Sequence, residues 1–242
     1  MKNRALALMA LLCCFAAPEV RAAQTTLKLM TEDYPPFNMV DANGQIVGLG
    51  TDVVREVMRR AHIPYTIQLQ PWIRSFNLSV MENNTCVYST TRTENREHQF
   101  KWVGPILENP WVLYAGPKSP QGIYNIEDVR RYKIGGYSGD AVAQYLIARG
   151  FEVELTPFDQ LNAKKLAVGR IDFWATGKYL GSYLIQREKL SDLKPILVFN
   201  TAFMYLACNP GIPDQTILKL NNLLVGMHQD GFIDRTIRHY LP

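Results

Sequence analysis

The stretch "YSTTRTENREHQFKWVGP", residues 88–105, sets four hydroxyl side chains and two arginines between an apolar segment and an aromatic one. A planar guanidinium binds a carboxylate through two parallel hydrogen bonds, which a lysine cannot do. On one interpretation, Arg96 pairs with Glu94 or Glu97 in a solvated turn. On the other, Arg96 binds an anion with Arg92 beside it.

The segments before this stretch alternate between strand and helix patterns. Strands are predicted by alternating apolar residues or by short apolar runs, and helices by apolar residues four apart. The order strand, helix, strand, helix, strand is typical of a parallel sheet with crossover helices. These five segments are residues 26–32, 51–63, 65–71, 72–84 and 85–90.

The second half of the chain repeats this design. An extended segment leads into four further strand patterns separated by helices, and two helices interrupted near Gly231 close the chain. The extended and strand segments are residues 100–116, 133–137, 151–157, 171–176 and 202–209. Two such units in sequence predict two α/β lobes with a cleft between them. Ligands of open α/β sheets bind beyond the carboxyl ends of strands, which is where residues 88–105 begin.

The N-terminal residues have the pattern of an export signal. Residues 1–22 open with Lys2 and Arg4, continue with an apolar run and end on small residues, as a cleavable signal peptide does. The apolar run is shorter than the stretch of about 20 residues that crosses a bilayer. Cys13 raises the alternative of a lipid anchor, but Leu12 precedes it where a small residue is expected. We therefore expect an exported, periplasmic protein.

Composition and motifs argue against several other classes of function. The net charge is only +4, and basic residues form no run beyond isolated pairs, so no nucleic-acid partner is expected. The four histidines lack metal-ligand spacing, and we expect no metal. The sequence "GGYSGD" at residues 135–140 lacks the spacing of a nucleotide-binding loop, so we expect no cofactor. No nucleophilic motif is recognised, and no catalytic residue is predicted.

Five segments, in this order, resemble the family-3 extracellular solute-binding proteins, which are periplasmic polar-amino-acid receptors of ABC importers. The resemblance extends over essentially the whole chain after the signal peptide, and this extent makes it specific. The segments are "TEDYPPFNMVDANGQIVGLGTDVVREV" (31–57), "CVYSTTRTENREHQFKWVGPI" (86–106), "KIGGYSGDAVAQYL" (133–146), "LAVGRIDFWA" (166–175) and "QDGFIDRTIRHYL" (229–241).

The resemblance implies an α/β protein of the type II periplasmic-binding-protein fold, with two lobes joined by two crossovers and a cleft between the lobes. Lobe 1 is then discontinuous, formed by residues 23–109 and 200–242, and lobe 2 comprises residues 110–199. The crossovers are expected near Asn109–Trp111 and near Ile196–Asn200.

The resemblance also implies how the ligand is bound. The arginine at position 96 clamps the ligand's carboxylate, hydroxyl-bearing residues after the third strand add hydrogen bonds, an aromatic ring stacks on the ligand, and a helix start in lobe 2 receives the carboxylate. Two further residues follow the end of the second strand and are expected to face the same cleft. The candidate ligand-binding residues are Tyr34, Trp72, Arg74, Ser89, Thr91, Arg96, Ser138, Gly139, Asp140 and Ala141.

One position departs from the family pattern. Amino-acid receptors of this family carry an acidic residue a few positions after the "GRID" strand, where it grips the ligand's ammonium group. This chain has Gly177 there, followed by Lys178. Either Glu32, Asp33 or Asp140 substitutes for the missing acid, or the ligand lacks an ammonium group and Lys178 meets a second anionic group.

Two cysteines remain after the signal peptide. In the fold that the resemblance implies, the strand of residues 202–209 returns antiparallel beside the third strand, so Cys208 is expected to meet Cys86. A disulfide within lobe 1 is our hypothesis, and a pair of buried thiols is the alternative.

The resemblance therefore implies a monomeric receptor, not an enzyme, that closes on a small carboxylate-bearing solute and delivers it to a membrane permease. The solute is an amino acid or a related compound. One alternative is a receptor that signals to a membrane sensor protein. The other is an enzyme resembling cyclohexadienyl dehydratases, which share this fold and need a positioned acid in the cleft.

Overall fold

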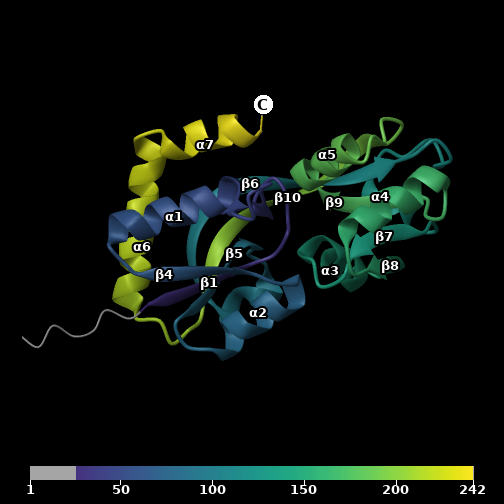
Figure 1. Ribbon diagram of the computed structural model, residues 1–242. Helices are drawn as coiled ribbons and strands as arrows, with labels where there is room; N and C mark the ends of the chain where they lie inside the picture. The colour runs from purple at the N-terminus through teal and green to yellow at the C-terminus, as the bar shows by residue number, and fades with distance from the viewer. Residues whose placement is uncertain (1–25, 242) are drawn as a thin grey trace, which may run out of the picture.

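The computed structural model describes residues 26–241, whose strands form an eight-stranded mixed sheet and a separate two-stranded hairpin. The strands of the sheet are β1 (Leu27–Thr31), β4 (Tyr65–Leu69), β5 (Thr85–Thr91), β6 (Lys101–Ala115), β7 (Ile134–Tyr137), β8 (Val153–Thr156), β9 (Phe173–Gly177) and β10 (Lys194–Cys208). Their spatial order is β4-β1-β5-β10-β6-β9-β7-β8. The hairpin consists of β2 (Met39–Val40) and β3 (Ile46–Val47). Figure 1 shows two α/β lobes, with β6 and β10 running between them.

The first lobe is built as the βαβαβ pattern predicts, because β1 lies parallel to both β4 and β5. Its helices are α1 (Leu49–Ala61), α2 (Trp72–Met81), α6 (Asp214–Gln229) and α7 (Phe232–Tyr240). Successive side chains of a strand point to opposite faces of the sheet. Leu29 and Tyr88 accordingly pack in one core with α1 and α6, whereas Met30 and Val87 pack on the other face with α2. Helices therefore cover both faces of this lobe.

The second lobe repeats this layering around β7, which lies parallel to β8 and β9. Its helices are α3 (Ala141–Ala148), α4 (Asp159–Val168) and α5 (Lys178–Arg187), with a 3-10 turn, η2 (Ile126–Val129). Phe173 and Ala175 pack with α3, and Trp174 packs on the opposite face with α4 and α5. Trp174 is fully buried, as expected of a core residue in a strand.

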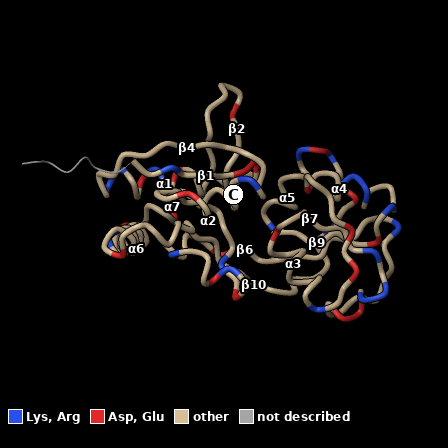
Figure 2. Tube along the Cα trace, turned by 90° about the horizontal axis from the view of Figure 1, so that it is seen from below, with Lys and Arg blue, Asp and Glu red and all other residues tan. Residues whose placement is uncertain are grey.

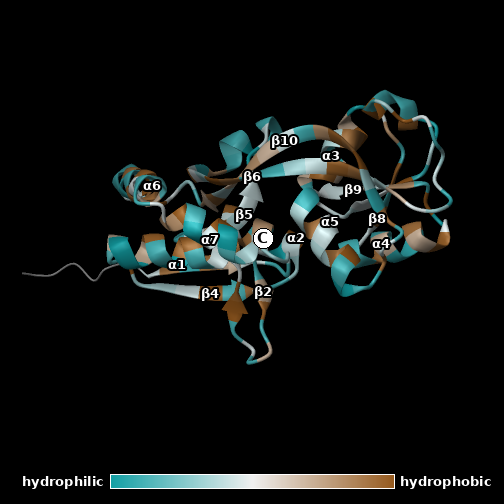
Figure 3. Cartoon of the chain, turned by 90° about the horizontal axis from the view of Figure 1, so that it is seen from above, coloured by the Kyte–Doolittle hydropathy of each residue, from teal (hydrophilic) through white to brown (hydrophobic). Residues whose placement is uncertain are grey.

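The two lobes share the paired strands β6 and β10, which lie antiparallel along their whole length. Beyond this pair, β6 bonds to β9 over residues 111–115, and β10 bonds to β5 over residues 204–208. Figure 3 shows these two strands passing together from one lobe to the other. β10 begins well before the predicted residues 202–209, because β6 supplies backbone partners from Lys194 onward.

A disulfide joins Cys86 of β5 to Cys208 of β10, as the hypothesis proposes. The two residues face each other in the antiparallel register of these strands. Figure 2 shows Lys and Arg residues interspersed with Asp and Glu residues along the trace of both lobes in the described part of the chain. Between residues 26 and 241, no helix has both the length and the apolar character of a membrane span. The expected signal peptide, residues 1–22, lies outside the described residues.

Candidate functional site

Arg96 lies in the 3-10 turn η1 (Glu94–Gln99) that follows β5, and its side chain is buried where the two lobes meet. One guanidinium nitrogen donates to the carbonyl oxygen of Thr91 at 3.2 Å. The other donates across the gap, to the carbonyl oxygen of Gly139 at 2.9 Å and to Oε1 of Gln144 at 3.2 Å. Arg96 therefore connects the end of β5 in one lobe to the start of α3 in the other.

Arg96 is thus not part of a solvated ion pair. Within residues 26–241, neither Glu94 nor Glu97 pairs with it, and Glu97 instead accepts two hydrogen bonds from Arg92, at 2.7 and 2.5 Å. Burial lowers the pKa of Arg96, and the charge of Asp140 acts in the opposite direction. The two arginines of the same stretch therefore have opposite environments: one is paired on the surface, and the other is buried against neutral oxygens.

Aromatic rings of α2 enclose Arg96 on its lobe-1 side. The guanidinium carbon lies 5.4 Å from the ring centre of Trp72 and 5.2 Å from that of Phe76, within the range of cation–π attraction. The indole nitrogen of Trp72 also donates to the carbonyl oxygen of Gly139 at 2.8 Å. A cavity of about 180 Å³ lies here between α2 and α3, with Gln144 in its lining. It is smaller than the roughly 300–1,000 Å³ of ordinary ligand pockets. The hydrogen bonds from Trp72 and Arg96 to the start of α3 show that the two lobes are closed on each other here.

The N-terminus of α3 faces Arg96 from the second lobe. Asp140 is the N-cap, and its side chain accepts from the backbone nitrogen of Ala141 at 2.7 Å. Burial raises the pKa of Asp140, and the charge of Arg96 acts in the opposite direction. Gly139 has a φ of 78°, a conformation in which glycine avoids the steric cost of a side chain. Ser138, next to it, bonds through its backbone nitrogen to Thr156 of β8.

Ser89 lies at an irregularity in β5. The register with β10 shifts between Ala207 and Tyr205, whose partners are Val87 and Thr90, so β5 carries an extra residue there. Ser89 has a φ of 56°, which is uncommon for a residue other than glycine. Its hydroxyl oxygen is buried without a hydrogen-bond partner among the described residues. A bulge of this kind redirects a side chain out of the regular ladder.

Tyr34 and Asn109 occupy the space beside Gly177, the position without the family's acidic residue. A Cβ atom on Gly177 would lie 2.8 Å from the hydroxyl of Tyr34 and 2.8 Å from both side-chain polar atoms of Asn109. A carboxylate side chain would therefore collide with these groups. Asn109 is 1% exposed, and its Oδ1 has no hydrogen-bond partner within the described chain.

Two buried carboxyl groups complete the surroundings. Oε2 of Glu32 accepts from the hydroxyl of Tyr137 at 2.6 Å, which is a contact between lobes, and burial raises the pKa of Glu32 well above its ordinary value. Asp159, at the start of α4, accepts from Asn162, from the indole of Trp174 and from the hydroxyl of Thr176. Burial raises the pKa of Asp159 to about 6.

The structure brings most of the predicted residues together and adds others. Arg96, Trp72, Thr91 and Gly139 are linked by the bonds described above, and Asp140 follows directly. Sequence reasoning did not single out five residues of this group: Phe76, Asn109, Tyr137, Gln144 and Asp159. Phe76 and Gln144 each lie four residues after a predicted site residue, Trp72 and Asp140, on the same helix, and that spacing was a usable signal.

Arg74, a predicted ligand-binding residue, and Lys178, considered as a contact for a second anionic group, are both exposed rather than buried between the lobes. Arg74 is exposed on α2, and its role in ligand binding remains a prediction. Lys178 is exposed at the first position of α5, and its ammonium nitrogen lies 6.0 Å from the ring centre of Tyr179. Neither side chain shares a hydrogen bond with Arg96 in the described chain.

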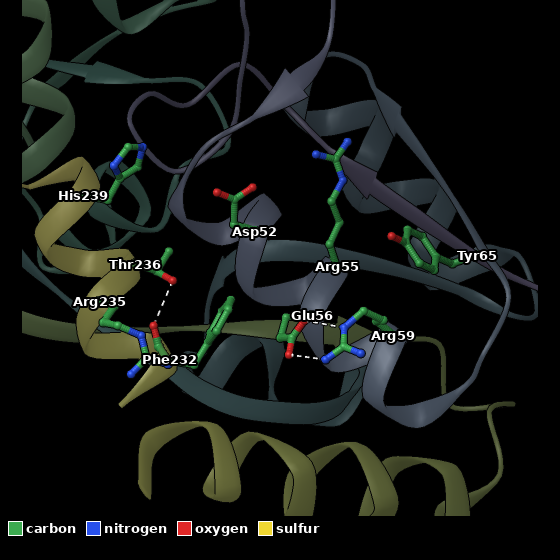
Figure 4. A pocket seen from close by; sticks show the side chains of 9 residues that line it. All are labelled: Asp52, Arg55, Glu56, Arg59, Tyr65, Phe232, Arg235, Thr236 and His239. Carbon is green, nitrogen blue, oxygen red and sulfur yellow. Dashed lines mark hydrogen bonds and ion pairs between the residues drawn. The ribbon is translucent and has the colours of Figure 1, made fainter. Parts of the chain in front are cut away.

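A second hollow, of about 520 Å³, opens on the first lobe between α1 and α7 (Figure 4). Of the two acidic side chains in its lining, one is ion-paired and the other accepts a hydrogen bond from a phenol. Glu56 accepts from Arg59 and from Arg60, and these bonds lower its pKa to about 2. Asp52 accepts from the hydroxyl of Tyr240 at 2.7 Å.

Two α/β lobes on one continuous sheet, closed around a buried arginine, form the kind of hinged scaffold on which binding proteins close around ligands. The chain belongs to the bacterial extracellular solute-binding proteins, family 3, whose family model matches residues 27–242. Two relatives from Escherichia coli (strain K12) are named as ABC transporter arginine-binding proteins. One is 27% identical over 155 residues, 62% of each chain, so the match spans under two thirds of that relative. The other is 23% identical over 86% of this chain and 87% of its own length.

Solved structures agree on the fold. A histidine kinase sensor domain with similarity to periplasmic binding proteins superposes with a TM-score of 0.83 at 21% identity, covering 89% of this chain and 96% of its own. An ancestral arginine-binding protein bound to arginine gives 0.78 at 20%, covering 90% and 98%. The predicted type II periplasmic-binding-protein fold is therefore confirmed. The relatives are named as binding proteins, which agrees with the expectation of a receptor and gives no support to the dehydratase alternative.

Proposed function

We propose that this protein is a periplasmic receptor that closes its two lobes on a small carboxylate-bearing solute and delivers it to an ABC permease. One observation carries the proposal. Arg96 is a permanently charged group buried between the lobes, and each of its hydrogen-bond acceptors is a neutral oxygen. A buried charge that forms no hydrogen bond to an opposite charge is costly, so Arg96 favours an anionic ligand even though the charges of Asp140 and Glu32 also act on it.

A ligand can bind because its carboxylate is a stronger hydrogen-bond acceptor for Arg96 than the neutral oxygens that Arg96 contacts in the closed form. In the closed form, the carbonyl of Gly139 and the amide of Gln144 occupy Arg96. When the lobes separate, these bonds break and the guanidinium becomes available. A ligand carboxylate offers Arg96 two charge-assisted hydrogen bonds, and the positive dipole end of α3 faces the carboxylate from the opposite lobe. Because both lobes contact the same carboxylate, the ligand stabilises the closed state.

The other parts of the proposal concern residues and boundaries. Tyr34, Trp72, Ser89 and Thr91 line the site from lobe 1, and Ser138–Ala141 line it from lobe 2. The lobe boundaries are those stated above, with lobe 1 formed by residues 23–109 and 200–242. Export depends on the signal peptide at residues 1–22. The names of the two arginine-binding relatives make arginine one of the first solutes to test.

A thermal-shift screen of amino acids and small carboxylates tests this function. A ligand at a hundred times its dissociation constant stabilises the folded protein by about 2.7 kcal/mol. Arg96→Ala should abolish the shift caused by any carboxylate that binds the wild type. Arg92→Ala is the matched control, because Arg92 is paired with Glu97 on the surface, and it should keep the shift. An equal response in Arg96→Ala and the wild type would overturn the proposal.

The sensor alternative has one observation in its favour, the structural similarity to a histidine kinase sensor domain. That similarity concerns the fold alone, and transport and sensing use the same cleft. Crosslinking the ligand-bound protein in membranes of its own organism would distinguish them, because a permease and a sensor kinase differ in mass and identity. Capture of a sensor kinase without a permease would show that the receptor signals to a kinase, and the proposed delivery to a permease would be wrong.

A further inference from the structure

Three acidic side chains and one arginine lie close enough to the meeting of the lobes for their charges to act on one another. Arg96 is the cation, and the acids are Glu32, Asp140 and Asp159. Two of the acids already have structural partners: Asp140 caps α3, and Asp159 accepts three side-chain hydrogen bonds within its own lobe. Glu32 differs, because its carboxylate is bonded to the phenol of Tyr137 on the facing lobe. A group that bridges the lobes through a neutral donor can exchange that donor for a charged one.

A second, independent feature lies in the same region. Oδ1 of Asn109 is an acceptor without a partner in the described chain, on a side chain that is 1% exposed. It converges with the hydroxyl of Tyr34 on the space that a side chain at Gly177 would fill. Burial raises the pKa of the Tyr34 hydroxyl, the charges of Asp140, Asp159 and Glu32 raise it further, and the side chain of Asn109 lowers it, so this space lies within the electrostatic reach of the acids. An unsatisfied buried acceptor of this kind costs stability unless a donor reaches it.

We propose that Glu32, Tyr34 and Asn109 form a subsite for the ammonium group of an amino-acid ligand, in place of the acid that position 177 lacks. This inference rests on the proposed function, because Arg96 must hold the carboxylate of the same ligand. An ammonium group brings three N–H donors and one positive charge. Its donors match the carboxylate of Glu32 and the unpartnered oxygen of Asn109, and its charge offsets part of the acidic excess.

The other candidates for this role fit less well. Asp33 is exposed beside Glu32, where water weakens its attraction for a bound cation. Asp140 is committed to the backbone at the start of α3. The rival arrangement, in which Lys178 meets a second anionic group of the ligand, requires that side chain near Arg96. Lys178 is instead exposed on α5, beside the ring of Tyr179.

The test compares each amino acid that binds with its desamino acid, which keeps the side chain and carboxylate but lacks the ammonium group. Calorimetry on the wild type should give at least about tenfold tighter binding of the amino acid, as a charge-assisted hydrogen bond implies. Glu32→Gln is isosteric and can still accept from Tyr137. It should weaken the amino acid about tenfold or more while leaving the desamino acid unchanged. Asp33→Asn is the matched control and should keep the wild-type preference.

Asn109→Ala provides a second variant if Glu32→Gln folds poorly, and it should also reduce the preference for the amino acid. Equal affinity of the wild type for both compounds, or an unchanged preference in Glu32→Gln and Asn109→Ala, would overturn the inference. In that case the proposed function still stands if Arg96→Ala abolishes binding of both compounds. If no carboxylate binds the wild type at all, the proposed function fails and the subsite fails with it.

Discussion

Two glutamates of the first lobe, Glu56 and Glu32, have opposite electrostatic environments. In the hollow between α1 and α7, hydrogen bonds from Arg59 (Figure 4) and from the neighbouring Arg60 lower the pKa of Glu56 to about 2. Between the lobes, burial raises the pKa of Glu32 well above its ordinary value, and its side chain accepts a hydrogen bond from the phenol of Tyr137. One glutamate is neutralised by neighbouring arginines of its own helix. The other is buried without an arginine in hydrogen-bonding contact.

The difference separates a charged surface from a binding site. In the hollow, Glu56 is ion-paired with Arg59, so a cationic ligand would have to break that pair to reach Glu56. Between the lobes, Arg96 and Glu32 are each bonded to neutral groups, so a zwitterion can improve the bonding of both. Concentration of charge is therefore a poor guide to a ligand site, and buried charge without a partner of opposite sign is a better one.

The largest expected effect comes from reversing the arginine charge in each region. Arg96→Glu would add a fourth carboxyl group to the region of Glu32, Asp140 and Asp159 and remove its cation, and we expect a loss of about 3–5 kcal/mol in the free energy of unfolding. Arg59→Glu, on the exposed rim of the hollow, should cost at most about 1 kcal/mol. Urea unfolding at neutral pH measures both. Equal losses in the two variants would break the comparison.

A smaller effect is expected from the pH dependence of unliganded stability. Burial raises the folded-state pKa of Asp159 from its ordinary 3.8 to about 6, so the folded protein holds this proton more tightly than the unfolded chain. Its contribution to stability therefore falls as pH rises from about 4 to about 6, by up to roughly 3 kcal/mol.

Asp159→Asn should remove that fall and increase stability above pH 6. The variant fits the local bonding, because Asn Oδ1 can accept from Asn162 and Trp174 while the hydroxyl of Thr176 rotates to accept. Urea unfolding across this pH range measures the slope. An unchanged slope in the variant would remove Asp159 as its source.

The smallest effect belongs to Glu56 and has the opposite sign. Its folded-state pKa of about 2 lies below its ordinary value of 4.5, so its contribution is present above about pH 4.5 and is lost as pH falls toward 2. Glu56→Gln should flatten this acid limb and cost under about 1 kcal/mol at neutral pH, because the pair is near the surface. The effect should shrink at high salt. A loss that persists in high salt would indicate packing rather than charge.

Patterns in the sequence were sufficient for the fold and for part of the site. The alternation of strands and helices predicts both lobes, and the antiparallel return of β10 beside β5 is what places Cys208 against Cys86. Residues 88–105 alone leave two interpretations of Arg96 open, and the family resemblance favours the carboxylate clamp. The alternation is a local periodicity that a single sequence displays directly, whereas the return of the last strand and the role of Arg96 come from the resemblance.

The remaining features depend on distant contacts. Nothing near Asn109 in the sequence shows that it meets Tyr34 and Gly177, because the three residues come from different segments of the chain. Asp159 looks like the first residue of an ordinary amphipathic helix, and its burial follows from Trp174 and Thr176 of a strand that comes later. The extra residue at Ser89 appears only when β5 is paired with β10.

The paired strands β6 and β10 also limit how the two halves can move apart. The two strands that connect the lobes are hydrogen-bonded to each other, so sliding one lobe past the other would break the backbone hydrogen bonds between these strands. Bending leaves those bonds in place, and the register shift between Val198 and Asn200 lies beside the passage from one half to the other. A small bend of a few residues in this strand pair would therefore move the two lobes far apart at Arg96.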